Sequence, residues 1–435
     1  MNLSSAGPNR RQFLAGGSMA VSSLATAASG AFPKGFLWGA ATAAHQVEGN
    51  NVNSDVWVLE HVKPTMYVEP SGDACDHYHR YRDDIRLLAS LGFNTYRFSI
   101  EWARIEPEKG SFSNAELEHY RRMLGTCREN SLTPMVTFYH FTMPRWLAAM
   151  GGWENEATVD LFARYCERSA KHLGDLIAIA STVNEPNIPA LLNWIPQFRS
   201  AGANQAEVSS AAARAVGSDR FASMLFGATE KTASHLIAAH HRGLAAMKSG
   251  PGKYPVGVNL AMSDDQAVGP DSRRDEKRRT VYGPWLAAAA KSDYIGVQTY
   301  SRSRVGNGLD LPPEQGVELT DMGYEFWPEA LEQAIRYAHE QARVPVYVTE
   351  NGVATENDSR RIEYIRRALS GVENCLRDGI DVRGYVHWSM LDNFKWIFGY
   401  RPKFGLIAVN RETQERTVKP SARYLGEIAR RNALS

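Results

Sequence analysis

The feature that most constrains this chain is a regular alternation between short apolar runs and segments in which apolar residues repeat with helical spacing. The runs are rich in β-branched and aromatic residues, as strands are. Strands that alternate with helices favour a parallel sheet, and eight of them favour closure into a barrel. We therefore predict an α/β fold, a single (β/α)8 TIM barrel over residues 32–435. The eight runs are residues 36–43, 95–100, 134–140, 177–185, 254–261, 294–300, 345–350 and 382–390.

One helical segment between these runs is especially regular. Apolar residues recur every three or four positions over residues 358–377, which predicts an amphipathic helix there. Gly379 lies two residues beyond this segment and is typical of a helix end. The repeating residues are Ile362, Ile365, Leu369, Val372 and Leu376.

Composition and charge exclude several classes of protein. The chain has 435 residues, of which 43% are hydrophobic and 22% charged, so it can bury a large core. Its formal charge is +1, which lacks the basic excess of a nucleic-acid binder. The four cysteines lie far apart and form no zinc or disulfide pattern. We expect buried thiols, no nucleic-acid partner, and no metal or cofactor.

The N-terminal segment has the pattern of an export signal. Only two charged side chains occur in its first 31 residues, within Asn9-Arg10-Arg11-Gln12-Phe13-Leu14, and a weakly apolar stretch over residues 13–28 follows. Ala25-Thr26-Ala27 supplies a small-x-small cleavage site. This pattern resembles a twin-arginine signal peptide, so we predict a signal over residues 1–31, contact with the twin-arginine export machinery and a periplasmic or secreted protein. No later run reaches roughly 18 apolar residues, so no stable membrane insertion is expected.

Polar side chains fall at or near the C-terminal ends of the predicted strands. Those ends meet on one face of a closed parallel barrel, the face that carries the chemistry. A buried strand end is a costly place for a carboxylate unless it faces a polar cavity or is hydrogen-bonded. Two glutamates at the same barrel mouth therefore predict a catalytic site. The residues are Gln46, His140, Asn184, Glu185, Tyr300, Glu350 and Trp388.

At these positions the sequence resembles glycoside hydrolase family 1, the β-glucosidase family of retaining (β/α)8 barrels. The resemblance covers nearly all of the chain after the N-terminal signal. Each motif alone is weak, but their order and their position at predicted strand ends make the set specific. The motifs are residues 32–49, 75–80 and 96–102, Thr182-Val-Asn184-Glu185-Pro186, Val348-Thr-Glu350-Asn-Gly352, and Trp388-Ser-Met-Leu-Asp-Asn-Phe-Lys395-Trp396.

The resemblance implies a role for each catalytic residue. Glu350 would be the ionised nucleophile, and Glu185 the protonated acid and later the base. Arg97 and Tyr300 match residues that contact the nucleophile, and a guanidinium there would favour its carboxylate form. Retention of configuration requires the two carboxyls to lie roughly 5 to 5.5 Å apart.

The resemblance also implies a subsite for the sugar whose bond is broken, the glycone. Gln46, His140, Asn184 and Trp396 match residues that hydrogen-bond the ring hydroxyls. Trp388 matches the aromatic floor beneath the apolar face of the sugar. Polar groups that converge over an aromatic platform suit a polyhydroxylated ligand, because an unpaired hydroxyl would cost free energy.

The charge at Lys395 departs from the family pattern. The family has a Glu there that accepts hydrogen bonds from the 4- and 6-hydroxyls of the sugar, so Lys395 replaces an acceptor with a donor. If its ammonium points into the glycone pocket, it favours an acidic glycone such as a uronide or a sulfated sugar. If it turns outward or pairs with Asp392, a neutral sugar remains the expected substrate.

Two wall segments also differ from the family. Phe141 stands where a Trp is usual, and Gln298 stands where an Asn is usual. Residues 191–203, which follow the acid/base, lack the usual glycine-rich stretch and carry Trp194, Phe198 and Arg199. That segment should shape the subsite of the leaving group, the aglycone, whose preference the sequence leaves open.

Three functions are therefore compared. The first is a retaining β-glycosidase that hydrolyses terminal β-linked sugars without a metal or cofactor. The second has the same fold and mechanism with an acidic glycone. The third is a non-catalytic sugar-binding protein on the same barrel, which both Glu185 and Glu350 disfavour because such a protein needs neither.

Overall fold

Eight parallel strands close into a barrel, as the sequence predicts. The computed structural model describes residues 31–225 and 230–434. The strands pair in the order β1-β10-β9-β7-β5-β4-β3-β2, and each neighbouring pair is parallel. They are β1 (Leu37–Ala41), β2 (Thr95–Ser99), β3 (Thr133–Tyr139), β4 (Ile179–Asn184), β5 (Val256–Ala261), β7 (Tyr294–Thr299), β9 (Val346–Asn351) and β10 (Val382–Trp388).

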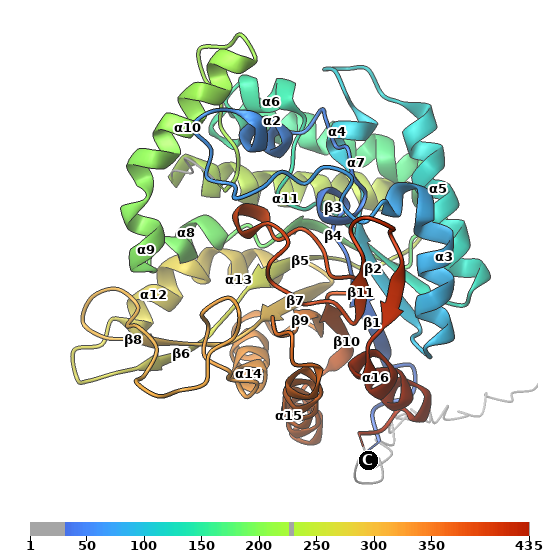
Figure 1. Ribbon diagram of the computed structural model, residues 1–435, viewed down its shortest axis with the longest axis vertical. Coiled ribbons are helices and arrows are strands. Elements are labelled where there is room, and N and C mark those ends of the chain that lie inside the picture. Colours follow the sequence, from blue (N-terminus) through green and yellow to red (C-terminus); the bar gives the residue numbers. More distant parts are fainter. Residues whose placement is uncertain (1–30, 226–229, 435) are drawn as a thin grey trace, which may run out of the picture.

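A helix packs on the outer face of the barrel in the segment that follows each barrel strand. Figure 1 shows these helices around the strands, with α3 and α5 on one side and α14, α15 and α16 below. In the part of the chain that the structure describes, no helix is both long and apolar enough to cross a membrane. The helices are α3 (His77–Ser90), α5 (Asn114–Glu129), α7 (Ala157–Leu173), α11 (Glu230–Ser249), α13 (Gly283–Ala289), α14 (Ala330–Ala342), α15 (Asp358–Arg377) and α16 (Pro420–Arg431).

Helix α15 has the bounds that its apolar repeat predicts. The side chain of Asn357 accepts a hydrogen bond from the backbone N–H of Ser359 and caps the first turn. Gly379 follows the helix with φ 82°, a left-handed conformation that glycine adopts without a steric penalty. Both ends of this helix are therefore determined by residues next to them in the sequence.

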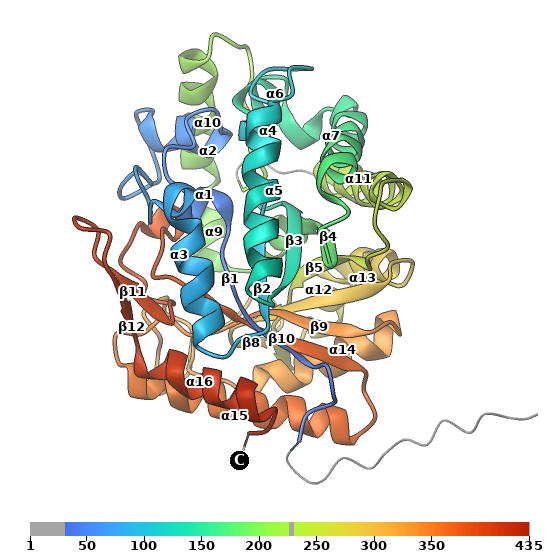
Figure 2. The same cartoon turned by 90° about the vertical axis from the view of Figure 1, so that its right-hand side faces the viewer.

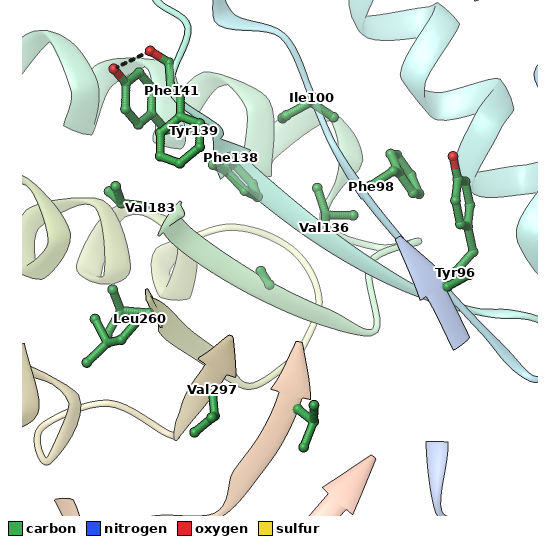
Figure 3. Close-up of a cluster of buried hydrophobic side chains, with 14 of the residues drawn as sticks. Tyr96, Phe98, Ile100, Val136, Phe138, Tyr139, Phe141, Val183, Leu260 and Val297 are labelled. Carbon is green, nitrogen blue, oxygen red and sulfur yellow. Dashed lines mark hydrogen bonds between the residues drawn. The ribbon is translucent and has the colours of Figure 1, made fainter. Parts of the chain in front are cut away.

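Buried apolar side chains form two clusters, one on each side of the barrel wall. Along β3, Val136 and Phe138 belong to the larger cluster, whereas Met135 belongs to the smaller one. Because successive side chains of a barrel strand point to opposite faces, the larger cluster joins the strands to the helices and the smaller one fills the barrel. Figure 3 shows part of the larger cluster, with Phe98 and Phe138 on neighbouring strands. All four cysteines are buried and free, as predicted.

Further elements, most of them short, follow the C-terminal ends of the strands and build the mouth of the barrel. In Figure 2, α1, α2, α9 and α10 and the β11–β12 pair lie on the left of the barrel. Strands β6 and β8 pair in parallel, and β11 and β12 pair antiparallel. The elements are α1 (Ala44–Val47), α2 (Asp55–His61), α4 (Trp102–Ile105), α6 (Arg145–Ala149), η1 (Gly152–Glu154), α8 (Ile188–Leu192), α9 (Pro196–Ser200), α10 (Gly202–Ala215), β6 (Asp264–Ala267), α12 (Arg274–Val281), β8 (Arg302–Val305), η2 (Trp396–Phe398), β11 (Ile407–Val409) and β12 (Arg416–Val418).

The segment before β1 is joined to the segment after α16. The backbone N–H of Phe32 donates to the carbonyl of Asn432 at 2.9 Å, and the Asn432 side chain donates back to the carbonyl of Phe32 at 2.7 Å. The indole of Trp38 donates to the same asparagine, and Ala31 pairs with Ala433. The predicted signal over residues 1–31 lies outside the described residues, apart from Ala31.

Candidate active site

The site residues that the sequence predicts gather at the mouth of the barrel. Arg97, Asn184, Glu350 and Trp388 lie on strands β2, β4, β9 and β10. The others directly follow a strand or lie in the elements after it. They are Gln46 in α1, His140 after β3, Glu185 after β4, Tyr300 after β7, and Lys395 and Trp396 after β10.

Glu350 is a buried carboxylate held by three donors. Arg97 Nη1 donates to its Oε1 at 2.6 Å, and Gln298 Nε2 donates to the same oxygen at 3.0 Å. The Tyr300 hydroxyl donates to Oε2 at 2.5 Å. A guanidinium and two neutral donors stabilise negative charge on this oxygen pair.

Asn184 links the environment of Glu350 to the rest of the site. Its Oδ1 accepts hydrogen bonds from Arg97 Nη2 at 2.5 Å and from Gln298 Nε2 at 2.8 Å. Its Nδ2 lies 3.4 Å from His140 Nε2. In the sequence, Gln298 is identified only as a departure from the family pattern. Its place near the C-terminal end of β7 is the signal that could have assigned it to the site.

Glu185 has a different environment from Glu350, although both carboxyls are buried. Burial, followed by the negative charge of Glu350, raises the pKa of Glu185 to about 8, against the opposing charges of Lys395 and Arg97. The carboxyl lines the cavity at the barrel mouth. It is therefore a protonated acid at neutral pH, next to a carboxylate that three donors hold.

The residues predicted for the glycone subsite include an aromatic layer beside buried polar atoms. The ring of His140 stacks on Trp388 at 5.8 Å and on Trp396 at 6.2 Å between centroids. Burial, with the charges of Arg97 and Lys395, holds the pKa of His140 well below its usual range, so its ring is neutral. Within the described residues, His140 Nδ1 and Trp388 Nε1 are buried without a hydrogen-bond partner. Such atoms are rare in folded proteins and suit a ligand rich in hydroxyls.

Gln46 is fixed by the loop that carries the closing motif. Its Nε2 donates to the carbonyl of Phe394 at 2.5 Å and to Asn393 Oδ1 at 3.2 Å. Its Oε1 is buried and has no partner among the described residues. The carboxamide is thus held at one end, and its oxygen remains free to accept a hydrogen bond.

Lys395 turns inward. Its Nζ lies 5.6, 5.4 and 4.7 Å from the ring centroids of Tyr300, Trp388 and Phe404, and its side chain lines the cavity. Burial lowers the pKa of Lys395, and the charges of Glu350 and Glu185 oppose that shift.

From the sequence, Asp392 is an alternative partner for Lys395, but Asp392 already forms an ion pair with another lysine. Asp392 pairs instead with Lys419 Nζ at 2.8 Å. Neither the outward orientation of Lys395 nor its pairing with Asp392 is therefore observed.

The cavity above these residues has a volume of about 260 Å³. Four of the predicted site residues line it, Glu185, Tyr300, Lys395 and Trp396, and Phe141 adds an aromatic wall. Of the three residues singled out after the acid/base, only Phe198 lines the cavity, whereas Trp194 is buried beneath Arg273 and Arg199 is exposed.

A closed parallel barrel with two buried carboxyls at its mouth, one of which accepts hydrogen bonds from Arg97, Gln298 and Tyr300, is the arrangement expected of a glycoside hydrolase. The chain belongs to glycosyl hydrolase family 1, because the sequence profile of that family matches residues 28–294 and 287–434. The resemblance drawn from the motifs is thereby confirmed, and the chain is a β-glycosidase.

Relatives cover nearly the whole chain. The crystal structure of β-glycosidase BGL167 has 54% sequence identity and a TM-score of 0.89, and the match covers 92% of this chain and 98% of that one. The apo structure of β-glucosidase 1317 has 51% identity and a TM-score of 0.89, over 91% and 98% of the two chains. Beta-glucosidase A from Thermotoga maritima is 30% identical over 462 residues, which cover 93% of this chain and 98% of the relative.

Proposed function

We propose that this chain hydrolyses terminal β-linked sugars with retention of configuration, with Glu350 as the nucleophile and Glu185 as the acid/base. The observation that carries the proposal is the contrast between the two carboxyls. Glu350 accepts hydrogen bonds from Arg97, Tyr300 and Gln298, whereas burial beside Glu350 keeps Glu185 protonated. Two carboxyls with opposite protonation states are what a double displacement requires.

The reaction has two steps. In the first, a Glu350 oxygen attacks the anomeric carbon while Glu185 gives its proton to the leaving oxygen, so the aglycone departs as an alcohol. In the second, the Glu185 carboxylate takes a proton from water, whose oxygen displaces Glu350 from the anomeric carbon. Both carboxyls then return to their starting states, and the sugar keeps its β configuration.

Substitution of each carboxyl tests these roles separately. Glu350→Ala should abolish hydrolysis. Glu185→Ala should lose about 10²- to 10⁴-fold in kcat/KM on substrates with poor leaving groups, but it should still be glycosylated by dinitrophenyl glycosides, which need little protonation. Azide should then rescue the Glu185 variant and yield the β-glycosyl azide. An α-azide, or full activity of Glu350→Ala, would contradict the assignment.

A second candidate substrate is a sugar with a carboxylate or sulfate, and the inward orientation of Lys395 favours it. Its ammonium lies over Trp388, the floor proposed for the glycone, and beside Tyr300. An anionic group within hydrogen-bond distance of that ammonium would gain on the order of 1 to 4 kcal/mol. A neutral glucoside would instead rely on the free Gln46 oxygen and the indole of Trp396.

Hydrolysis of aryl β-glucuronide and aryl β-glucoside by wild type and by Lys395→Glu separates the two glycones. If Lys395 recognises an acid, the substitution shifts the ratio of kcat/KM toward the glucoside by at least tenfold. The exposed Lys291→Glu is the matched control and leaves the ratio unchanged. Preference of the wild type for the glucoside, with no shift in Lys395→Glu, contradicts acid recognition.

The sugar-binding alternative without catalysis is tested by the same panel. A binding protein would turn over none of the aryl β-glycosides and would still retain the sugar. The buried and protonated Glu185, together with a Glu350 that Arg97 and Tyr300 hold, supports turnover instead, because a sugar-binding site has no use for that pair.

We also propose that the protein is exported through the twin-arginine pathway and acts in the periplasm or outside the cell. The proposal rests on the isolated pair Arg10 and Arg11 ahead of a weakly apolar stretch.

A further inference from the structure

The outer part of the active-site cavity has an apolar wall. Helices α8 and α9 and the turn between them form this wall, and η2 and Met66 add further apolar side chains to the lining. The wall residues are Ile188, Leu191, Leu192, Ile195 and Phe198, and η2 contributes Ile397 and Phe398.

These wall residues are incompletely covered by the rest of the protein. All five are only partly buried, and neither α8 nor α9 contains a fully buried residue. Aliphatic and aromatic side chains gathered in a concave patch gain free energy when a ligand displaces water from them. The wall is therefore suited to an apolar ligand group.

The wall is tied directly to the acid/base residue. The backbone N–H of Ile188, the first residue of α8, donates to the carbonyl of Glu185 at 3.0 Å. Glu185 gives its proton to the oxygen that joins sugar and aglycone, so the aglycone leaves beside α8. Glu185 and Tyr324 line the same cavity.

The wall is also held in place before any ligand binds. Between α8 and α9, the buried Trp194 donates from its backbone to the carbonyl of Leu191 at 3.0 Å, and its own carbonyl accepts from the backbone of Asp310 at 2.9 Å. The guanidinium of Arg273 lies 5.3 Å from the Trp194 ring centroid. A preorganised wall loses little conformational entropy on binding.

The largest polar side chain in the cavity lining, Arg302, already makes hydrogen bonds and ion pairs within the protein. Arg302 donates from Nη1 to Gln266 at 3.1 Å, from Nη2 to Glu314 at 3.2 Å, and from Nε to Glu325. Its guanidinium also lies 3.8 Å from the ring centroid of Trp327. This guanidinium uses its N–H groups in hydrogen bonds and stacks its face on an aromatic ring. It therefore has little capacity left to donate hydrogen bonds to the hydroxyls of a second sugar.

From these observations we infer that the leaving-group subsite selects an apolar aglycone, an aryl or alkyl alcohol with at most one or two further polar groups, over a second sugar. The inference rests on the proposed function and names the leaving group of that same reaction. Gln205 and Ser263 also line the cavity and can serve the few polar groups of such an aglycone. A sugar in this position would place several hydroxyls against Leu191, Ile195 and Phe198, which offer no hydrogen bond.

A homologous series of alkyl glycosides tests the inference, because methyl, butyl, hexyl and octyl alcohols are similar leaving groups and differ mainly in apolar surface. The series uses the glycone that the wild type releases fastest as its dinitrophenyl glycoside. We expect kcat/KM to rise on the order of 10- to 100-fold from methyl to octyl, since each buried methylene favours binding. The octyl glycoside should also exceed the β-1,4-linked disaccharide, although a sugar hydroxyl is the better leaving group.

Two matched variants locate the effect on the wall. Leu191→Asn keeps the size of a lining side chain and adds polarity, so it should reduce kcat/KM on the octyl glycoside about tenfold and leave the methyl glycoside nearly unchanged. Leu176→Asn, in the turn before β4, is the control and should change neither.

The outcomes separate this inference from the proposed function. No turnover of any dinitrophenyl β-glycoside overturns the proposed function. Turnover of that substrate, with equal values for methyl and octyl glycosides or with the disaccharide preferred, overturns the apolar subsite alone. The wild-type series decides the question even if Leu191→Asn fails to fold.

Discussion

At the scale of single residues, the active site contains three non-glycine residues in the left-handed region of backbone conformation. Phe141, Glu185 and Trp396 have φ values of 71°, 43° and 50°, and all three line the cavity. Each such conformation costs of order 1 to 3 kcal/mol and persists only where surrounding contacts impose it. These three backbone conformations direct an acid and two aromatic rings into one cavity, which is where the conformational cost has a functional use.

The raised pKa of Glu185 predicts the alkaline limit of activity. Because the acid must be protonated, kcat/KM should fall above about pH 8, where the free enzyme loses that proton. The charge of Lys395 lowers the pKa of Glu185, so Lys395→Gln should move this limb to higher pH. The measurement is the pH profile of kcat/KM on one aryl glycoside. A limb that stays in place or moves to lower pH in the variant would contradict the role assigned to this charge.

Substitution of Gln298 should reduce activity, although the sequence motifs do not assign this residue to the site. Gln298→Leu removes one donor that serves both Glu350 and Asn184. Loss of a hydrogen bond to a charged group is worth about 1.5 to 3 kcal/mol, so kcat/KM should fall roughly 10- to 100-fold. Steady-state kinetics check this against Gln341→Leu, an exposed control in α14. Equal activity of the two variants would place Gln298 outside the catalytic arrangement.

At the scale of elements, the sequence predicted the barrel and the place of the site at its mouth, but not the short helices and strands that surround that mouth. The eight strands and α15 carry local signals, namely β-branched runs and a regular apolar repeat. Helices α8 and α9, which form the wall of the cavity, have five residues each and are too short to show an apolar repeat. Strands β6 and β8 are polar and pair only because β5 and β7 bring them together. The orientation of Lys395 is likewise a tertiary property, because it depends on Lys419 occupying Asp392.

A buried charge cluster anchors one element of the mouth. Lys277 in α12 is fully buried and lies 2.8 Å from Asp265 of β6 and 2.7 Å from Asp310. Lys277→Met would remove the cation that both acids share and leave only Arg278, 3.9 Å from Asp265, which should cost about 3 to 5 kcal/mol of unfolding free energy. Denaturant unfolding measures the loss.

Two further variants check that the loss comes from the cluster. The exposed Lys291→Met should leave the free energy of unfolding nearly unchanged. Adding Asp265→Asn and Asp310→Asn to Lys277→Met should restore part of the loss, because neutral amides need no cation. Equal stability of Lys277→Met and wild type would show that the cluster contributes nothing.

At the scale of the whole molecule, the proposed twin-arginine export would carry the folded barrel rather than the unfolded chain. If Arg10 and Arg11 direct it, their joint replacement by Lys should leave active enzyme in the cytoplasm. Fractionation followed by an aryl glycoside assay measures the distribution, and the specific activity of the retained enzyme should equal that of wild type. Unchanged export of the double variant would rule out the twin-arginine assignment.

The pairing of the first strand also bears on how the chain reaches its native state. Strand β1 pairs with β2, which follows soon after it, and with β10, which is synthesised near the end. Until β10 leaves the ribosome, both β1 and the newest strand present unpaired backbone edges that invite association with other chains. Closure is thus a late, long-range event, and such events are slow. We expect the nascent chain to depend on chaperones for most of its synthesis.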